Sequence, residues 1–355
     1  MSAIWQIRLK GLDGALDAII DDYEQFTLSK IVNGVGTYAL RMRAGDAKVA
    51  LFVLDSQLEF WRRDEGQGLA WYKEAEYFHR GWRPYLTAEG AYMFESTGVA
   101  YTHLLKRRII VPSVNITGSK TGAAETVIKA FVDEQAGPGS TRPFTGFTLE
   151  ADGAGGNSVT MERSWRNLLE VCQEIAAVGG GDFDVIGSGA ATFEFDWYAG
   201  QRGTDRSATV TFAPEFGNMA SADLRRTRHD EINAVLAGGD GEGATRVTVW
   251  SETAGLINDS TWNRCEAFVN GTQEGTGTAG LTTAGAAELW QNRPRDEFTC
   301  TVLQIPGSYY GQHYFFGDLV TTRFGSYSGT KKIQSVTITV SAPEAEAITV
   351  ELVDV

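Results

Sequence analysis

Two carboxylates in the sequence have a spacing that could serve acid–base chemistry. Glu194 and Asp196 lie two residues apart in Thr192–Trp197, a segment whose alternation predicts a β-strand. Residues two apart on a strand share a face, and glycoside hydrolases work with such a pair of carboxyl groups. The residues that flank and separate the pair are aromatic, so the same pattern describes a half-buried strand with one wet face. We interpret the pair as that wet face, with a cell-wall glycosidase as the alternative.

No other motif points to a catalytic, cofactor or metal site. The four histidines share no metal-ligand spacing, and Cys172, Cys265 and Cys300 lie too far apart for a zinc motif or a disulfide framework. The glycine-rich stretches 179–189 and 238–243 lack the lysine and hydroxyl residue of a phosphate-binding loop. The sequence therefore predicts no catalytic residue, no cofactor and no metal, and the protein is not expected to be an enzyme.

Aromatic residues are concentrated between Leu58 and Trp82, with seven in twenty-five positions. They could form a stacking platform, as in a carbohydrate-binding module, or the two faces of a β-hairpin. Alternation on either side of the Gly66–Gly68 turn distributes them over both faces, whereas a platform would collect them on one exposed face beside basic residues. We therefore predict that this hairpin contributes to a core or a subunit interface through Trp61, Trp71, Tyr72, Phe78 and Trp82.

The composition excludes several classes of partner. The chain has 355 residues and a formal net charge of -14, and an acidic surface repels the phosphates of nucleic acids and anionic membranes. DNA could still pass through a channel with such a surface without adhering to it. No apolar run reaches the length of a membrane span, and the first residues lack a signal-peptide core. We expect synthesis in the cytoplasm and no membrane insertion.

The predicted elements are mainly β-strands. Short alternating runs separated by Gly and Asp indicate strands in the first hundred residues, and Val49–Leu54 is a continuous apolar run that predicts a strand buried on both faces. Strands resume after Thr192, and Lys331–Val340 and Ala347–Val353 alternate cleanly. Short strands at this spacing suggest a barrel or a sandwich.

Helical spacing appears in the middle of the chain. Apolar residues recur at helical intervals in Thr121–Asp133, and again in a second helix that begins at Trp165. Ser164 is the expected cap of the second helix, and Gly179–Gly181 is its expected end. A further short helix is predicted over Thr283–Gln291. The predicted fold class is therefore mainly β with an α/β insertion.

The order of these features resembles the hub proteins of bacteriophage tail tips, the tail-associated or baseplate-hub family of siphophages. The resemblance spans nearly the whole chain. It rests on the order of several segments, which are Tyr23–Val32, Tyr38–Arg43, Leu58–Asp64, the helical stretches Ala123–Val132 and Trp165–Ala177, Asn233–Gly243 with Arg246, Arg264–Asn270, Phe316–Val320 and Lys332–Val340.

The resemblance implies two β-barrels like those of tail-tube subunits, joined by a small helical module. We expect a first barrel over residues 1–112, a helix-containing insertion over 113–190, and a second barrel over 191–355 with a short helical insertion near 258–295. It further implies a structural virion protein, three copies of which form a ring below the tail tube around the DNA channel. The expected neighbours are the distal tail protein, the tape measure protein and a tail fibre or spike, and the expected location is the tail tip of the virion.

One glycine-rich loop is a candidate contact within such a ring. The loop Gly238–Gly243 combines expected flexibility with the charges of Asp240 and Glu242. We predict that these two residues contact a neighbouring protein or the channel.

Overall fold

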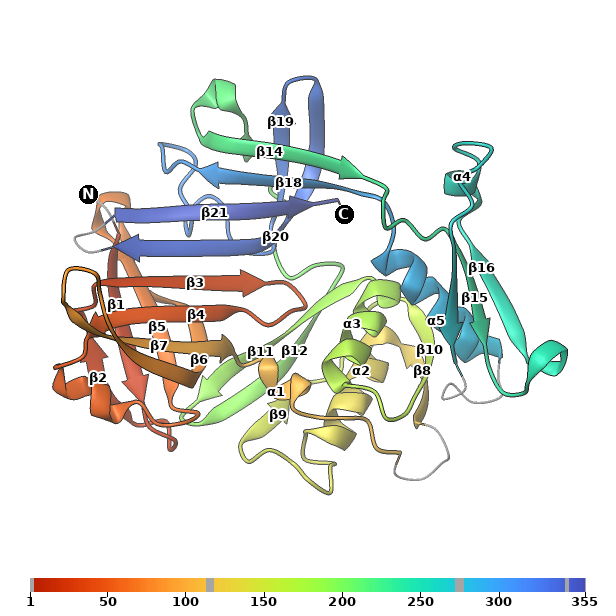
Figure 1. The fold of residues 1–355 in the computed structure, drawn as a ribbon, viewed down its shortest axis with the longest axis horizontal. Helices are drawn as coiled ribbons and strands as arrows, with labels where there is room; N and C mark the ends of the chain where they lie inside the picture. The colour runs from red at the N-terminus through yellow and green to blue at the C-terminus, as the bar shows by residue number, and fades with distance from the viewer. Residues whose placement is uncertain (1–2, 113–117, 272–277, 342–344, 355) are drawn as a thin grey trace.

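The computed structural model describes residues 3–112, 118–271, 278–341 and 345–354 (Figure 1). Strands dominate these residues, which confirms the mainly-β prediction with few helices. The boundary predicted between residues 112 and 113 falls at the edge of a stretch outside the described residues.

The first hundred residues form a set of antiparallel strands. Their pairing order is β3-β4-β7-β6-β5-β1-β2, so each strand from β4 to β1 has a neighbour on both sides. Two short 3₁₀ helices lie in their connections, at Ala47–Leu51 (η1) and Glu65–Gln67 (η2). The strands are β1 (Ile4–Lys10), β2 (Leu16–Ile20), β3 (Gln25–Ile31), β4 (Thr37–Arg43), β5 (Gln57–Asp64), β6 (Leu69–Leu86) and β7 (Tyr92–Ala100).

The C-terminal strands extend the same sheet. Strand β20 pairs antiparallel with β3, from Ser335 opposite Ile31 to Ser341 opposite Gln25, and Figure 1 shows β21, β20, β3 and β4 side by side. We call the resulting thirteen-stranded sheet the main sheet. Its pairing path runs from β14 to β2 without closing among the described residues, so the barrel detail is not confirmed. The added elements are β13 (Thr211–Phe212), η3 (Pro214–Phe216), β14 (Met219–Thr227), β18 (Arg295–Val302), β19 (Leu319–Phe324), β20 (Tyr327–Ser341) and β21 (Ala345–Val353).

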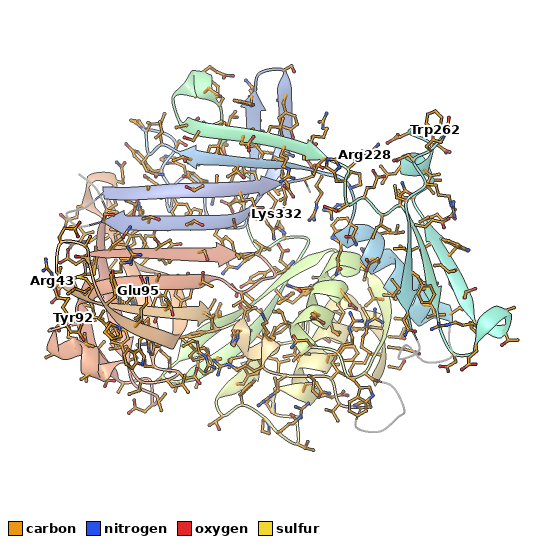
Figure 2. All side chains as sticks on the ribbon, in the orientation of Figure 1. Arg43, Tyr92, Glu95, Arg228, Trp262 and Lys332 are labelled. Atoms are coloured by element: carbon orange, nitrogen blue, oxygen red, sulfur yellow. The ribbon has the colours of Figure 1, made fainter. Side chains whose placement is uncertain are left out.

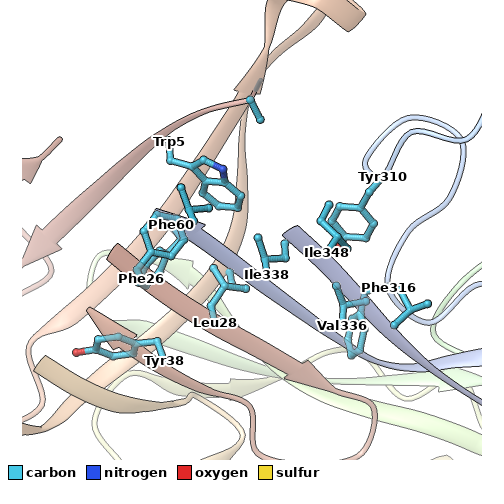
Figure 3. Packing of buried hydrophobic residues seen from close by; sticks show 14 of the residues in the cluster. Trp5, Phe26, Leu28, Tyr38, Phe60, Tyr310, Phe316, Val336, Ile338 and Ile348 are labelled. Atoms are coloured by element: carbon cyan, nitrogen blue, oxygen red, sulfur yellow. The ribbon is translucent and has the colours of Figure 1, made fainter. Parts of the chain in front are cut away.

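The core of the main sheet draws on both ends of the chain. Alternate residues of β20 and β21 meet aromatic residues of β1, β3 and β5, as Figure 3 shows. Ile338 is directly opposite Leu28 in the β3–β20 register, and both are fully buried. The intervening threonines point to the other face, where the hydroxyls of Thr27 and Thr339 lie 3.2 Å apart. Because burial of one such aliphatic side chain contributes about 1.5–3 kcal/mol, this shared core ties the two ends together.

A second body, the helical layer, lies beside the main sheet. Its own apolar core packs α2 and α3 against one face of the β11–β12–β9 sheet. The remaining pair, β8 and β10, is antiparallel and lies next to the same helices. The elements are α1 (His103–Lys106), β8 (Gly118–Ala123), α2 (Ala124–Gln135), β9 (Phe147–Leu149), β10 (Ser158–Arg163), α3 (Leu168–Gly179), β11 (Gly181–Gly189) and β12 (Thr192–Ala199).

The predicted start of α3 was wrong, whereas its predicted end is confirmed. Asn167, not Ser164, caps the helix, because its side-chain oxygen accepts a hydrogen bond from the backbone N–H of Leu169 at 3.0 Å. Trp165 lies outside the helix with a left-handed φ of 61° and is 60% exposed. At the other end Gly180 adopts φ 66°, the left-handed conformation that glycine reaches at low cost.

The continuous apolar run Val49–Leu54 is not a buried strand, and that prediction was wrong. Asp46 caps a 3₁₀ turn there by accepting a hydrogen bond from the backbone N–H of Lys48 at 2.8 Å. Phe52 packs on Phe94, but Leu54 is 61% exposed. A local cap therefore overrides the apolar pattern, because an apolar run by itself does not specify a strand partner.

The third body, the outer module, projects from the side of the helical layer (Figure 1). Its three-stranded sheet has the order β16-β15-β17, and α5 covers one face while also contacting α3 and β10. Helix α5 confirms the helix predicted over Thr283–Gln291, with an earlier start. The elements are β15 (Ala234–Gly238), η4 (Gly243–Thr245), β16 (Thr248–Glu252), α4 (Ala254–Ile257), β17 (Glu266–Asn270) and α5 (Thr278–Gln291).

Candidate functional site

The aromatic hairpin β5–β6 is irregular. Register shifts after Phe60 and Arg62 interrupt its alternation. Trp61 and Trp71 are half-buried, and the guanidinium groups of Arg8 and Arg63 lie over their rings at 3.9 and 5.0 Å from the centroids. Arginine over an aromatic ring is an attractive arrangement that holds the ring in place.

Tyr72 belongs to a buried polar cluster instead. Its hydroxyl accepts a hydrogen bond from Arg62 at 3.1 Å, and Arg62 also binds the Glu346 carboxylate of β21 at 2.8 and 3.0 Å. Burial, together with the charge of Glu74, raises the pKa of Tyr72 far above its ordinary value. This cluster connects β5 and β6 to the C-terminal strand.

Phe78 and Trp82 lie in opposite environments. Phe78 is 4% exposed, and its ring packs on Tyr101 and Phe193 with centroid distances of 4.6 and 5.2 Å. This contact joins β6 to strand β12 of the helical layer. Trp82 is 62% exposed and stacks only one side on Phe94. Of the predicted residues, Phe78 is thus a core residue of the monomer, and Trp82 is available to a partner.

The carboxylate pair lies on one face of the β11–β12–β9 sheet. Asp196 is opposite Asp184 in the register and accepts a hydrogen bond from the Tyr198 hydroxyl at 3.3 Å. Burial, with the negative charges of Glu150 and Glu194, raises the pKa of Asp196. The aromatic residues that flank and separate the carboxylates face the core of the helical layer, as the sequence pattern predicted.

The acidic loop lies at the tip of the β15–β16 hairpin. Asp240 and Glu242 are exposed, and backbone hydrogen bonds between Val247 and Asp240 and between Gly239 and Val247 hold the loop closed. The loop is therefore presented to solvent by the outer module. Whether it contacts a neighbour stays a prediction.

A small charged cavity of about 240 Å³ lies between β3, β6 and β11. Glu74 accepts hydrogen bonds from Lys30 at 2.7 Å and from the Tyr310 hydroxyl at 2.6 Å. Glu76 accepts hydrogen bonds from Lys73 at 2.6 Å and from the backbone N–H of Gly187 at 3.0 Å. Asp184, the third carboxylate of the lining, accepts a hydrogen bond from Arg202 at 3.1 Å. All three carboxylates are therefore paired with protein groups, which describes a structural network.

A larger cleft of about 930 Å³ separates the main sheet and the end of α5 from the helical layer. At its floor the buried carboxylate of Asp182 accepts hydrogen bonds from Lys332 at 2.6 Å and from Asn33 at 2.9 Å. Lys332 lies at the end of the main sheet that faces the helices (Figure 2). Sequence reasoning missed this site, because its residues are about 150 positions apart and share no motif.

Several carboxylates predict how stability depends on pH. Burial alone would raise the pKa of Asp55, but hydrogen bonds from Arg107 and Arg80 outweigh it and lower that pKa below its ordinary value. Arg83 and Arg41 lower the pKa of Glu95 in the same way. The stability from such groups is present above the unfolded pKa, about 4, and is lost as the pH falls through the folded pKa.

We therefore expect the urea midpoint to fall slowly below about pH 6.5, because burial lowers the folded pKa values of His79 and His103 and the unfolded chain protonates these residues first, and to fall more steeply below about pH 4. Burial raises the pKa values of Glu76 and Asp196, and these two groups oppose the loss of stability in acid. More carboxyl groups have a lowered pKa than a raised one, so the loss of stability prevails. Tryptophan fluorescence during urea unfolding at a series of pH values measures the midpoint. In Asp55→Asn the midpoint should fall less steeply below about pH 4 than in the unchanged protein. A midpoint that rises on acidification would contradict the expectation.

The described part of the chain holds no group of three or more His, Cys, Asp or Glu placed to bind a metal ion. Within the same residues, no helix is long and apolar enough to cross a membrane.

Solved structures with the same fold include tail proteins and a chain of a two-protein complex. A tail protein from Neisseria meningitidis MC58 matches with a TM-score of 0.60 and 11% identity, over 100% of this chain and 97% of that one. The 43 kDa tail protein of prophage MuSo2 from Shewanella oneidensis matches with a TM-score of 0.57 and 13% identity, over 98% and 97%. A chain of the Francisella PdpA–VgrG complex matches with a TM-score of 0.53 and 9% identity, over 99% and 58%.

At these identities the likeness establishes the fold alone. No curated protein sequence matches the chain. A family model does match, and it covers residues 4–352 under the description Siphovirus ReqiPepy6 Gp37-like protein. This match includes the main sheet, the helical layer and the outer module. The chain belongs to the siphovirus ReqiPepy6 Gp37-like family of phage tail proteins.

Proposed function

We propose that this tail protein is the hub of the tail tip, a structural component that forms a trimeric ring around the path of the DNA. The observation that carries the proposal is the β3–β20 pairing, which joins the N-terminal and C-terminal strands into one curved wall. A ring subunit needs such a rigid wall, because a ring closes only when every copy presents the same geometry. The family and the likeness to phage tail proteins support a place in the virion tail.

The ends of the main sheet supply surfaces for contacts between copies. Strand β2 is the last strand of the pairing path, and its Leu16 and Ile19 are exposed. An edge strand with exposed apolar residues favours pairing with another chain. At the opposite end, β14 carries a bulge at Ser221, where φ is 48°, and a bulge twists an edge strand away from pairing. We propose that β2 is the edge that contacts a neighbouring copy.

The proposal includes the expected neighbours and domains. The partners are the distal tail protein, the tape measure protein and a fibre or spike, assembled with the ring in the cytoplasm of the host bacterium. The chain of the PdpA–VgrG complex shows that this fold occurs within a larger assembly. The division into residues 1–112, 113–190 and 191–355 stays a prediction, which limited proteolysis would test.

Two measurements test the hub. Antibody-gold labelling of whole virions should place this chain at the tail tip, and native mass spectrometry of detached tips should contain three copies of the 38.6 kDa chain. Gold along the tube, or a copy number of six, would overturn the proposal.

The hub proposal assigns no catalytic role to the carboxylate pair. The double variant Glu194→Gln/Asp196→Asn should leave virion assembly and infectivity unchanged, because both side chains are half-buried on one sheet face outside the two clefts described above. Plaque counts and zymograms with bacterial cell wall measure this. Loss of a cell-wall clearing band with assembly intact would favour the glycosidase alternative.

A further inference from the structure

The sheet of the outer module has one covered face and one open face. Val235 and Ser251 point towards α5, because a Cβ added at Gly285 of that helix would lie 2.5 Å from the Ser251 hydroxyl oxygen and 3.9 Å from Val235. Helix α5 lies between this sheet and the helical layer (Figure 1). Since side chains alternate along a strand, the residues on either side of these two point away from α5.

A row of three apolar side chains crosses the open face. Leu236 of β15 is paired with Trp250 of β16 on one side and with Phe268 of β17 on the other. Trp250 is 46% exposed, and Phe268 is 53% exposed. Because neighbouring strands lie about 4.8 Å apart, the two aromatic residues are separated by about 10 Å across Leu236. Two exposed rings therefore flank one aliphatic side chain on a single face.

The Phe268 ring lies close to the backbone of β15. A Cβ at Gly238 would lie 2.7 Å from the ring carbon Cζ, so the ring leans over a position that glycine leaves open. The guanidinium of Arg246 lies 5.1 Å from the ring centroid and donates hydrogen bonds to the Gly239 carbonyl, at 2.8 Å, and to the Asn270 side chain. The ring is therefore held against the sheet while much of it stays exposed.

Polar residues border the apolar row on both sides. Next to it on one side, the pairing places Thr248, Gly238 and Asn270. On the other side, it places Glu252, Ala234 and Glu266. Arg264 donates hydrogen bonds to both glutamates, at 2.6 and 2.5 Å, and its guanidinium lies 5.2 Å from the centroid of the Trp250 ring. The apolar strip is thus one row wide, between groups that donate and accept hydrogen bonds.

The charges on the open face balance. Arg246 and Arg264 contribute two positive charges, and Glu252 and Glu266 contribute two negative charges. The acidic loop at the tip of the same hairpin adds further negative charge. A chain of phosphates therefore meets no positive excess here, although neutralisation of phosphates supplies most of the affinity for nucleic acids. An uncharged ligand is the kind that this face favours.

We propose that the open face of the outer module binds an uncharged oligosaccharide, with the rings of Trp250 and Phe268 as its stacking surfaces. A sugar ring has an apolar C–H face and hydroxyl groups around its edge, which match a narrow apolar row between polar residues. A protein partner fits less well, because a stable protein interface buries about 1,200–2,000 Å² around an apolar core, whereas this row holds three apolar residues. The inference stands whether or not the chain forms the trimeric ring.

A glycan array tests the site on the full-length protein. The array presents uncharged hexose and N-acetylhexosamine oligosaccharides, their sialylated and uronic-acid counterparts, and a thymidine octanucleotide. The test variant is Trp250→Ala/Phe268→Ala. The matched control is Trp165→Ala/Phe216→Ala, which removes a tryptophan and a phenylalanine that are 60% and 51% exposed and lie outside the outer module. Thermal unfolding verifies that the variants fold, and the single variants Trp250→Ala and Phe268→Ala serve if the double variant does not.

We expect the protein to bind uncharged oligosaccharides. Binding should weaken at least about tenfold in Trp250→Ala/Phe268→Ala, because two stacked rings are lost, and should stay unchanged in the control. For the uncharged oligosaccharide that binds most tightly, the affinity should change less than about twofold between about 0.05 and 0.5 M salt, because the contact involves no charge on the ligand.

Three results would overturn the proposal. The first is no binding to any uncharged oligosaccharide, or equal weakening in the test and control variants. The second is binding confined to the charged glycans or the octanucleotide, which would make the face an anion site. The third is self-association in light scattering that the test variant abolishes, without glycan binding, which would make the face a protein interface.

Discussion

Glu346→Gln is expected to lower the free energy of unfolding by about 3–5 kcal/mol. The Glu346 carboxylate accepts two hydrogen bonds from Arg62 and one from the indole N–H of Trp5 at 2.8 Å. Arg62 is 2% exposed, so the neutral amide would leave a buried guanidinium with only the more distant Asp64 carboxylate, at 4.0 Å, as its counter-charge. Because the pair joins β5 to β21 across 284 positions, the loss should weaken the closure between the two ends of the chain.

Urea unfolding followed by tryptophan fluorescence measures the change. The matched control is Glu24→Gln, which breaks the ion pair with Arg43 at 2.5 Å, where the two side chains are 41% and 66% exposed. An exposed pair contributes about 0–1 kcal/mol, so the control should change little. Arg62→Met/Glu346→Leu removes both charges and should lose less stability than Glu346→Gln alone. A Glu346→Gln loss no larger than that of the control would contradict the role of this pair.

Phe78→Ala is expected to destabilise the monomer by about 3–5 kcal/mol. Its ring fills the space between β6 and the helical layer, in contact with Tyr101 and Phe193, and the Arg107 guanidinium lies over it at 5.1 Å. Truncation would leave a cavity that these rigid rings cannot collapse to fill. The urea midpoint measures the loss, which should be accompanied by earlier proteolysis of residues in the helical layer.

Trp82→Ala is the matched comparison from the same strand. With most of its ring already in water, Trp82 should change the stability of the monomer by no more than about 1 kcal/mol. If the exposed hairpin end belongs to an interface, the variant should fold normally and reduce incorporation into virions, measured by tail-tip labelling. Normal incorporation would remove Trp82 from the proposed interface, and a Phe78→Ala variant as stable as Trp82→Ala would contradict the core assignment.

The main sheet and the helical layer meet through polar contacts as well as through Phe78. Asn33, in the β3–β4 turn, donates a hydrogen bond to Asp182 and accepts one from the backbone N–H of Phe183 at 2.8 Å. Lys332 reaches the same carboxylate from β20. The helical layer is therefore attached at several points of the main sheet, and the large cleft lies beside one of these attachments.

The sequence by itself determined the class of the fold and much of its element order. Lys331–Val340 alternates because one face of its strand is buried and the other is wet, and α3 ends at the predicted glycines because glycine reaches the left-handed conformation at low cost. Both rules depend only on residues that are close together in the sequence, and both segments follow them. The order of such segments also pointed to the tail-hub family, and the family model places the chain among siphovirus tail proteins.

Only the tertiary structure decided which distant segments meet. The pattern of β3 shows that one face is buried but does not identify β20, some three hundred residues later, as its partner. For the same reason no local signal revealed the Arg62–Glu346 pair or the Asp182–Lys332 contact. Periodicity reports the environment of a side chain, whereas the identity of its neighbours depends on the packing of the whole chain.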